Sequence, residues 1–201
     1  PLQVSPPGTG NMIEGLKITK NIRKAMAADG IRGPTQVQID AIGAVLAGKH
    51  VVMHTGTGTG KTLAYLLPLL QRLRESDGRV VVCAPGAELA MQTMRVVNAY
   101  KDDDLAAGAA IATSSHRRQR KRIQRSTRLI VGTPDRLSEM LRARKLKGVS
   151  AIVLDEIEPI LASRGAEFLD ELLSRSQAGV QLVVAAATLG KRSEAFIERF
   201  M

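Results

Sequence analysis

Short runs of aliphatic residues alternate along the chain with longer amphipathic stretches. A run such as Ala151-Ile152-Val153-Leu154 is apolar at consecutive positions, which is typical of a strand buried on both faces. Strands are predicted at residues 50–54, 79–84, 108–113, 128–132, 151–155 and 180–186. Helices are predicted near residues 18–28, 35–47, 61–75, 86–100, 115–125, 134–145, 165–175 and 191–200. Because strands that alternate with helices form parallel sheets, we expect an α/β sandwich.

The length of 201 residues suits one domain. Residues 1–12 are rich in proline and glycine, so we expect a flexible lead-in there and a single domain over residues 13–201. The sequence begins with Pro1 rather than an initiator methionine, which favours an excised piece of a longer protein.

A loop rich in glycine and threonine joins the predicted strand 50–54 to the predicted helix 61–75. It reads Thr55, Gly56, Thr57, Gly58, Thr59, Gly60, Lys61 and Thr62. This order is typical of a phosphate-binding P-loop, because glycines let backbone N–H groups converge on an anion at a helix N-terminus. Lys61 would reach the β- and γ-phosphates, and the Thr62 hydroxyl would hold Mg²⁺. Thr55 stands where the strict pattern has glycine, and a turn that binds nothing is the alternative.

Asp155 and Glu156 come directly after the predicted strand 151–155. Ligands of parallel sheets bind at the carboxyl ends of the strands, where the P-loop also lies. Asp155 would hold a phosphate-bound Mg²⁺, and Glu156 would polarise the attacking water. A helix N-cap with favourable first-turn charge is the alternative interpretation of this pair.

Composition adds a preference for a polyanionic partner. The chain has 29 basic and 19 acidic residues, a net charge of +10, which favours nucleic acid, although such an excess can also serve solubility alone. Aromatic residues make up only 2%, so little surface remains for stacking on bases. The single cysteine, Cys83, excludes a disulfide within the chain and suits a reducing compartment. No apolar run is long enough to span a membrane and no signal peptide is found, so we expect an intracellular protein.

Six short motifs occur in one order along the chain. They lie at residues 30–38, 55–62, 84–90, 133–136, 153–158 and 186–188. In this order and spacing they resemble the Q motif and motifs I, Ia, Ib, II and III of DEAD-box RNA helicases. The resemblance is to the first RecA-like domain of that family and covers nearly the full length of the chain.

This resemblance implies a RecA-like P-loop fold, a three-layer sandwich with a mainly parallel sheet and helices on both faces. It implies ATP and Mg²⁺ as ligands, RNA as the partner, and a second RecA-like domain that supplies arginines to the γ-phosphate. Because that domain would lie beyond Met201, we expect little ATPase activity and no unwinding from residues 1–201 alone.

The resemblance also implies a role for particular residues. ATP contacts are expected from Ile31, Pro34, Thr35, Gln38, Gly56, Thr57, Gly58, Thr59, Gly60, Lys61 and Thr62. Lys61, Asp155 and Glu156 would be catalytic, with Thr62 and Asp155 at the metal. RNA contacts are expected from Pro85, Gly86, Thr133 and Arg136, and coupling between ATP and RNA from Glu158 and Thr188.

Gln38 has a physical reason to select adenine. A side-chain amide donates and accepts together, which matches the N6 and N7 edge of adenine. A glutamine that only caps the helix near residues 35–47 is the alternative.

The chain departs from the family pattern at several motifs. Ile13 and Ile31 replace aromatics around the base, and Gly86-Ala87 replaces the Thr-Arg pair of motif Ia. Asp135 replaces a glycine of motif Ib and would place a carboxylate near RNA phosphate. Ala112-Thr113 replaces a pair of glycines, while the basic stretch 116–125 would either compensate with phosphate contacts or form a solvated helix face.

Motifs II and III are altered together. Motif II ends in Glu158 rather than aspartate, and Ala186 replaces the motif III serine, so the family's hydrogen bond between these groups cannot form. We expect the ATP-binding domain of a divergent DEAD-box RNA helicase. The alternatives are a degenerate, non-unwinding RNA-binding or assembly factor, and a P-loop NTPase unrelated to nucleic acid.

Overall fold

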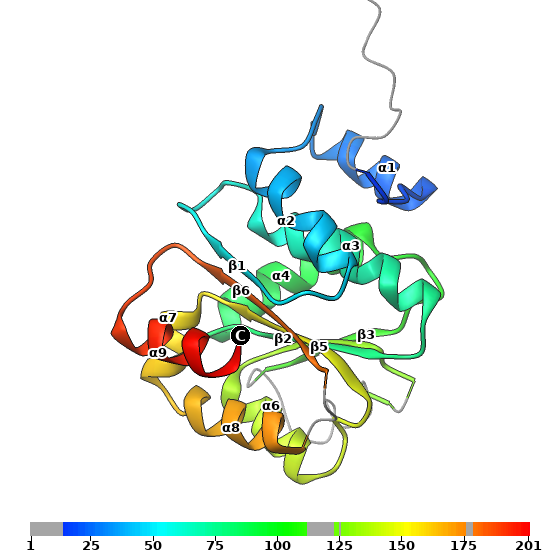
Figure 1. The fold of residues 1–201 in the computed structure, drawn as a ribbon. Coiled ribbons are helices and arrows are strands. Elements are labelled where there is room, and N and C mark those ends of the chain that lie inside the picture. The colour runs from blue at the N-terminus through cyan, green and yellow to red at the C-terminus, as the bar shows by residue number, and fades with distance from the viewer. Residues whose placement is uncertain (1–13, 112–122, 125, 176–178) are drawn as a thin grey trace, which may run out of the picture.

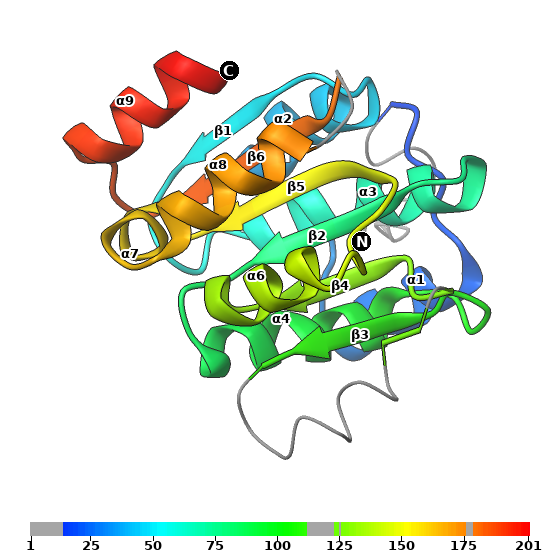
Figure 2. The ribbon, with the colours of Figure 1, turned by 90° about the horizontal axis from the view of Figure 1, so that it is seen from below.

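A computed structural model of the protein describes residues 14–111, 123–124, 126–175 and 179–201. Its centre is one six-stranded sheet in the order β1-β6-β5-β2-β4-β3, and every strand pairing is parallel. The strands are β1 (Val51–His54), β2 (Arg79–Cys83), β3 (Ala107–Ala110), β4 (Leu129–Gly132), β5 (Val149–Asp155) and β6 (Gln181–Ala186). Figure 2 shows them side by side, with β1 and β3 at the two edges.

Helices cover both faces of the sheet (Figure 1). One face carries α1 (Lys20–Ala28), α2 (Gln36–Leu46), α3 (Lys61–Glu75) and α4 (Ala87–Tyr100). The other carries α6 (Pro134–Arg142), α7 (Ile157–Ala162), α8 (Gly165–Arg175) and α9 (Lys191–Phe200). The expected three-layer α/β sandwich with a parallel sheet is confirmed.

Two hydrophobic cores lie on opposite sides of the sheet, and the strands contribute to both. Val153 of β5 belongs to the core under α2, α3 and α4, whereas its neighbours Ile152 and Leu154 belong to the core under α6, α7 and α8. This alternation explains why the strands are apolar at consecutive positions, because successive side chains point to opposite faces and both faces are covered.

Most element boundaries agree with the sequence predictions to within three residues. The helices predicted at 61–75, 165–175 and 191–200 have those bounds. The helix predicted at 134–145 is too long, since α6 ends at Arg142 and Arg144 adopts a left-handed backbone with φ 55°. The prediction missed the short helix α7, and the helix predicted at 115–125 lies largely outside the described residues, as does the lead-in 1–12.

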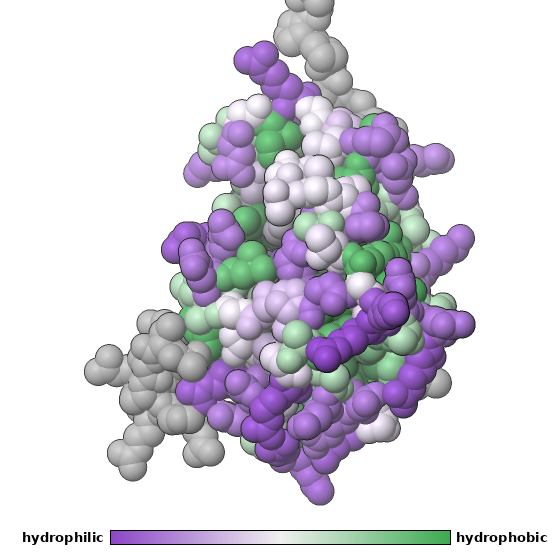
Figure 3. Space-filling model, turned by 90° about the vertical axis from the view of Figure 1, so that its left-hand side faces the viewer, coloured by the Kyte–Doolittle hydropathy of each residue, from purple (hydrophilic) through white to green (hydrophobic). Residues whose placement is uncertain are grey.

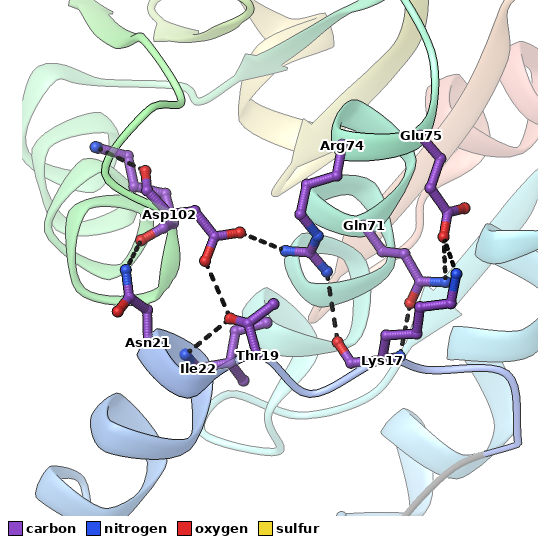
Figure 4. Close-up of polar contacts among 9 residues, drawn as sticks. Lys17, Thr19, Asn21, Ile22, Gln71, Arg74, Glu75 and Asp102 are labelled. Carbon is purple, nitrogen blue, oxygen red and sulfur yellow. Dashed lines mark hydrogen bonds and ion pairs between the residues drawn. The ribbon is translucent and has the colours of Figure 1, made fainter.

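Polar contacts hold the segment before α1 to the body of the domain (Figure 4). The backbone N–H of Lys17 donates to Gln71 Oε1 at 2.8 Å, and Thr19 Oγ1 donates to Asp102 Oδ1 at 3.1 Å. Asp102 also pairs with Arg74, whose Nη1 lies 2.9 Å from Oδ2. In the part of the chain that the structure describes, no helix has the length and apolar character needed to cross a membrane.

Candidate functional site

The carboxyl ends of β1, β6 and β5 meet at one end of the sheet and bring the glycine-rich loop close to the two acidic residues. The backbone N–H of Thr55, directly after β1, donates to Ala186 O at 3.1 Å. Asp155 ends β5 and lies in register with Ala185 of β6. This end of the molecule faces the viewer in Figure 3, where a pale area of intermediate hydropathy lies above a hydrophilic lower margin.

Two glycines give the loop its shape. Gly58 has φ 73° and Gly60, the residue before α3, has φ 93°, in the left-handed region that side chains disfavour. Gly56, Thr57 and Gly58 are exposed at the tip of the loop. The loop therefore leaves its outer backbone open to solvent while its base is fixed against the sheet.

Lys61 lies inside this loop. Its Nζ donates to Thr55 O at 2.6 Å and to Gly56 O at 2.7 Å, and only 7% of the residue is exposed. The loop thus surrounds the Lys61 ammonium group. The positive charge of Lys61 lies where the P-loop pattern expects a group that binds phosphate.

Thr55, which departs from the strict pattern, forms a side-chain hydrogen bond across the loop. Its Oγ1 lies 2.7 Å from Thr59 Oγ1, and Thr59 Oγ1 in turn donates to Gly56 O at 3.0 Å. A glycine at residue 55 has no side chain for this contact, so the departure stiffens the loop.

Gln38 joins α2 to the loop. Its Oε1 accepts from the backbone N–H of Thr35 at 3.0 Å, and its Nε2 donates to Gly60 O at 3.2 Å. Gln38 therefore caps the start of α2, which was the alternative interpretation. The oxygen and the nitrogen of its side-chain amide each still have one unused hydrogen-bonding direction for a ligand. Thr35 and Pro34 lie beside it, whereas Ile31 packs against the first hydrophobic core.

Asp155 is buried and oriented by two hydroxyl groups. Its Oδ2 accepts from Tyr65 Oη at 2.9 Å and from Thr93 Oγ1 at 3.3 Å. Burial raises the pKa of the Asp155 carboxyl, while the hydrogen bonds oppose this shift, and burial together with the nearby Asp155 charge raises the pKa of Tyr65. Tyr65 belongs to none of the motifs in the sequence, although it lies three residues after Thr62 and therefore on the same face of α3.

Glu156 has a strained backbone, with φ 63°, directly after β5. Its backbone N–H donates to Ala185 O at 2.7 Å, and its side-chain Oε2 accepts from the backbone N–H of Ala187 at 3.0 Å. Such strain at a non-glycine residue costs about 1 kcal/mol or more and is found mainly where function requires the side chain.

Glu158 has partners that the sequence analysis did not foresee. Ala186 offers no hydroxyl, as expected, but Oε1 of Glu158 accepts from the Gly190 backbone N–H and from Ser193 Oγ at the start of α9. These hydrogen bonds lower the pKa of the Glu158 carboxyl. Thr188, also predicted to couple, is exposed.

The predicted RNA-contact residues lie at the same end of the sheet. Pro85 and Gly86 follow β2, while Thr133 precedes α6 and follows the adjacent strand β4. Arg136 pairs with Glu139, with Nη1 2.7 Å from Oε2. Asp135 is exposed in the first turn of α6, and most of the basic stretch 116–125 lies outside the described residues.

Within the described ranges, no group of three or more His, Cys, Asp or Glu side chains could hold a metal ion. The oxygen-bearing side chains of Asp155 and Thr62 both interact with the Tyr65 hydroxyl and therefore lie close together.

A parallel sheet with a glycine-rich Lys-Thr loop at one strand end, facing a buried aspartate at another, defines a P-loop nucleotide-binding domain. A solved DEAD box protein from Methanococcus jannaschii shares this RecA-like fold, with a TM-score of 0.83 at 23% identity over 93% of this chain and 53% of that one. The family model for the DEAD/DEAH box helicase matches residues 35–196. The chain belongs to the DEAD/DEAH box helicase family.

Two relatives are helicases by name. A probable ATP-dependent RNA helicase, YfmL, from Bacillus subtilis is 35% identical over 86% of this chain and 47% of its own length. The DEAD-box ATP-dependent RNA helicase CshC from Bacillus cereus is also 35% identical, over 86% of this chain and 46% of its own. The chain thus spans about half the length of these curated relatives.

Proposed function

We propose that this chain is the ATP-binding domain of an ATP-dependent RNA helicase, in which ATP hydrolysis is coupled to the binding or remodelling of RNA. The observation that carries this proposal is the convergence of Lys61, Asp155 and Glu156 at the carboxyl ends of β1 and β5. The names of the similar helicases support the same activity.

The loop fits the phosphates of ATP. The Lys61 ammonium is held by two neutral carbonyl oxygens, and phosphate oxygens would replace them favourably because charged hydrogen bonds are stronger. Gly56, Thr57, Gly58, Thr59 and Gly60 would present backbone N–H groups. Gln38, next to Gly60, would read adenine, with Pro34, Thr35 and Ile31 beside the base.

Mg²⁺ would be held by Thr62 and by Asp155, which Tyr65 and Thr93 keep in one orientation. The ion supplies charge neutralisation for the phosphates. Glu156 would accept a proton from the attacking water, because the Ala187 N–H occupies only Oε2 and a carboxylate has further lone pairs to offer.

RNA would lie across Pro85, Gly86, Thr133 and Arg136, and the net charge of +10 favours it. Glu158 and Thr188 follow Asp155 and Glu156 along the chain and would relay the nucleotide state to the RNA site. A second RecA-like domain would complete the protein, which agrees with the length of its relatives. An intracellular location is inferred, since ATP and RNA are found there.

Lys61→Ala tests the ATP site. The substitution removes the ammonium that would contact the phosphates, so ATP affinity should fall at least several-fold in isothermal titration calorimetry. Lys24→Ala, an exposed lysine of α1, serves as the control and should leave affinity unchanged. Equal affinity in Lys61→Ala and the unmodified protein would contradict the assignment.

Glu156→Gln in the complete protein separates a helicase from a scaffold. The glutamine keeps the size of the side chain but cannot accept the proton of water, so RNA-stimulated ATP hydrolysis should fall by about 10²-fold or more. ATP binding should persist. A complete protein that shows no RNA-stimulated hydrolysis to lose would instead be the degenerate RNA-binding factor.

A further inference from the structure

The amino ends of β2, β5 and β6 lie toward the right in Figure 1, at the opposite end of the sheet from the candidate ATP site. A cavity lies at these amino ends. Its volume is about 550 Å³. The residues that line it precede or begin three adjacent strands: Asp77 before β2, Lys147 before β5, Ser150 within β5 and Val180 before β6. This volume is ample for a small organic ligand.

Cations dominate the lining. Arg72, Arg144, Lys147 and Arg175 surround the cavity, against one carboxylate, that of Asp77. Arg175 pairs with Glu171, with Nη2 2.8 Å from Oε1. Among the described residues, no carboxylate lies within ion-pair distance of the other three cations. Arg72 donates to the neutral side chain of Gln181, and partial burial lowers its pKa.

Cations without carboxylate partners are not a general property of the surface, as the groove between α6 and α8 shows. That groove, of 460 Å³, also has three arginines in its lining. Arg136 pairs with Glu139, Arg142 with Glu171 and Arg164 with Glu167. Its three arginines are neutralised within the protein, whereas three of the four cations in the cavity at the amino ends of β2, β5 and β6 have no carboxylate partner among the described residues.

Arg144 has an unfavourable, left-handed backbone conformation. It follows the C-cap of α6, and its N–H donates to Leu141 O at 2.9 Å with φ 55°. Glycine is the usual residue at this position, because a side chain is disfavoured in the left-handed region. The other described non-glycine residue with a left-handed backbone is Glu156, in the candidate ATP site. Strain of this kind gathers at functional sites, and Arg144 lies in the lining of the cavity.

We propose that this cavity is a second anion site, which binds a phosphate group through the exposed side chains of Arg144 and Lys147 and the half-buried side chain of Arg72. Three cations without carboxylate partners suit a multiply charged phosphate group, because each can donate a charge-assisted hydrogen bond. The phosphate comes either from an RNA strand that extends beyond the strand carboxyl ends or from a free phosphate-bearing molecule. The site is separate from the ATP site, and only the RNA source of the phosphate rests on the proposed function.

Two probes distinguish these sources in the complete protein. The first is inorganic pyrophosphate, titrated by calorimetry with excess ADP and Mg²⁺ present to fill the candidate ATP site. The second is a single-stranded oligouridylate, measured by fluorescence anisotropy. The variants are Arg144→Gly, Lys147→Gln and Asp77→Asn, and the charge-matched control is Lys24→Gln on α1.

Arg144→Gly and Lys147→Gln should each weaken binding by roughly three- to tenfold, the range of one charge-assisted contact. Asp77→Asn should strengthen it about twofold because a like charge is removed. Arg144→Gly should keep or raise the melting temperature, since glycine relieves the backbone. A structural role for Arg144 predicts the opposite.

Weaker binding of pyrophosphate supports a free phosphate ligand, and weaker binding of the oligouridylate alone supports RNA. Unchanged affinity for both probes in Arg144→Gly and Lys147→Gln overturns the proposal. An equal loss in Lys24→Gln also overturns it, because that result would reflect net charge only.

Discussion

Glu158 shows, at the scale of a single residue, how a missing partner can be supplied from elsewhere in the chain. The sequence places Ala186 where a hydroxyl is expected, yet the carboxylate is bound by Gly190 and Ser193 at the start of α9. Gly190 is suited to this contact, since an added Cβ would lie 3.0 Å from Glu158 Oε1. The link between the segment after β5 and the segment after β6 is therefore kept by different atoms.

Ser193→Ala should lower the free energy of unfolding by about 1–2 kcal/mol at neutral pH, because the buried hydroxyl donates to a charged group and caps α9. The pKa of Glu158 is lower in the folded chain than its ordinary value of 4.5, so ionised Glu158 stabilises the fold above that pH. The contribution is lost as the pH falls through the lowered pKa. The difference between variant and unmodified protein should therefore shrink in acid.

Urea denaturation from pH 7 down to pH 3 measures this difference. Ser174→Ala, which removes an exposed hydroxyl of α8, should change stability little at any pH. A cost for Ser193→Ala that stays constant across this range would mean that the Glu158 charge takes no part.

Among the contacts between elements, the one between α2 and the P-loop links the two parts of the candidate ATP site. Gln38 and Thr35, at the start of α2, lie against Gly60, where the loop passes into α3. A change in the conformation of the loop would therefore displace the start of α2, which carries Gln38, the residue predicted to read adenine.

Gly60→Ala should destabilise the domain by about 2 kcal/mol or more. Its new Cβ would lie 2.6 Å from Gln38 Nε2 and 3.0 Å from Thr35 Oγ1, in addition to the strain of φ 93°. Gly58→Ala is the matched control, since Gly58 has φ 73° but nothing within 4 Å, so strain of about 1 kcal/mol is expected alone. Thermal denaturation of both variants measures this difference in stability. Equal losses of stability in the two variants would show that the contact with α2 is unimportant.

The sequence predicts long elements well and contacts between them poorly. The consecutive apolar positions of β5 and the amphipathic patterns of α3, α8 and α9 are local signals, so the predicted bounds agree closely with the observed ones. The helix α7 was missed because it has only six residues, one of them proline. Ser193 and Tyr65 were missed because their partners, Glu158 and Asp155, lie 35 and 90 residues away in the chain.

The whole molecule presents two chemically different ends of one sheet. The carboxyl ends of the strands carry the candidate ATP site and the predicted RNA residues, and acidic residues lie among them. Asp135 is one, exposed in the first turn of α6. The amino ends of β2, β5 and β6 carry the cationic cavity.

Asp135→Gly should strengthen the binding of single-stranded RNA, because it removes a carboxylate from the predicted RNA path. If one more phosphate is then neutralised, the slope of log affinity against log salt should steepen by about 0.7. Anisotropy titrations at several salt concentrations measure the slope. Asp103→Gly, a change of the same charge near the amino end of β3, is the control, and an equal response in both would place RNA elsewhere.

The order of strands has a consequence for how the protein is made. Among the strands that the structure describes, β1, which leads into the P-loop, pairs only with β6, about 130 residues later in the chain. At roughly 5–20 residues per second, the ribosome takes on the order of 7–26 s to synthesise that interval. Throughout it β1 has no neighbour within the sheet, so the nucleotide pocket is completed among the last parts of the domain. A nascent chain would gain ATP affinity only after β6 has emerged.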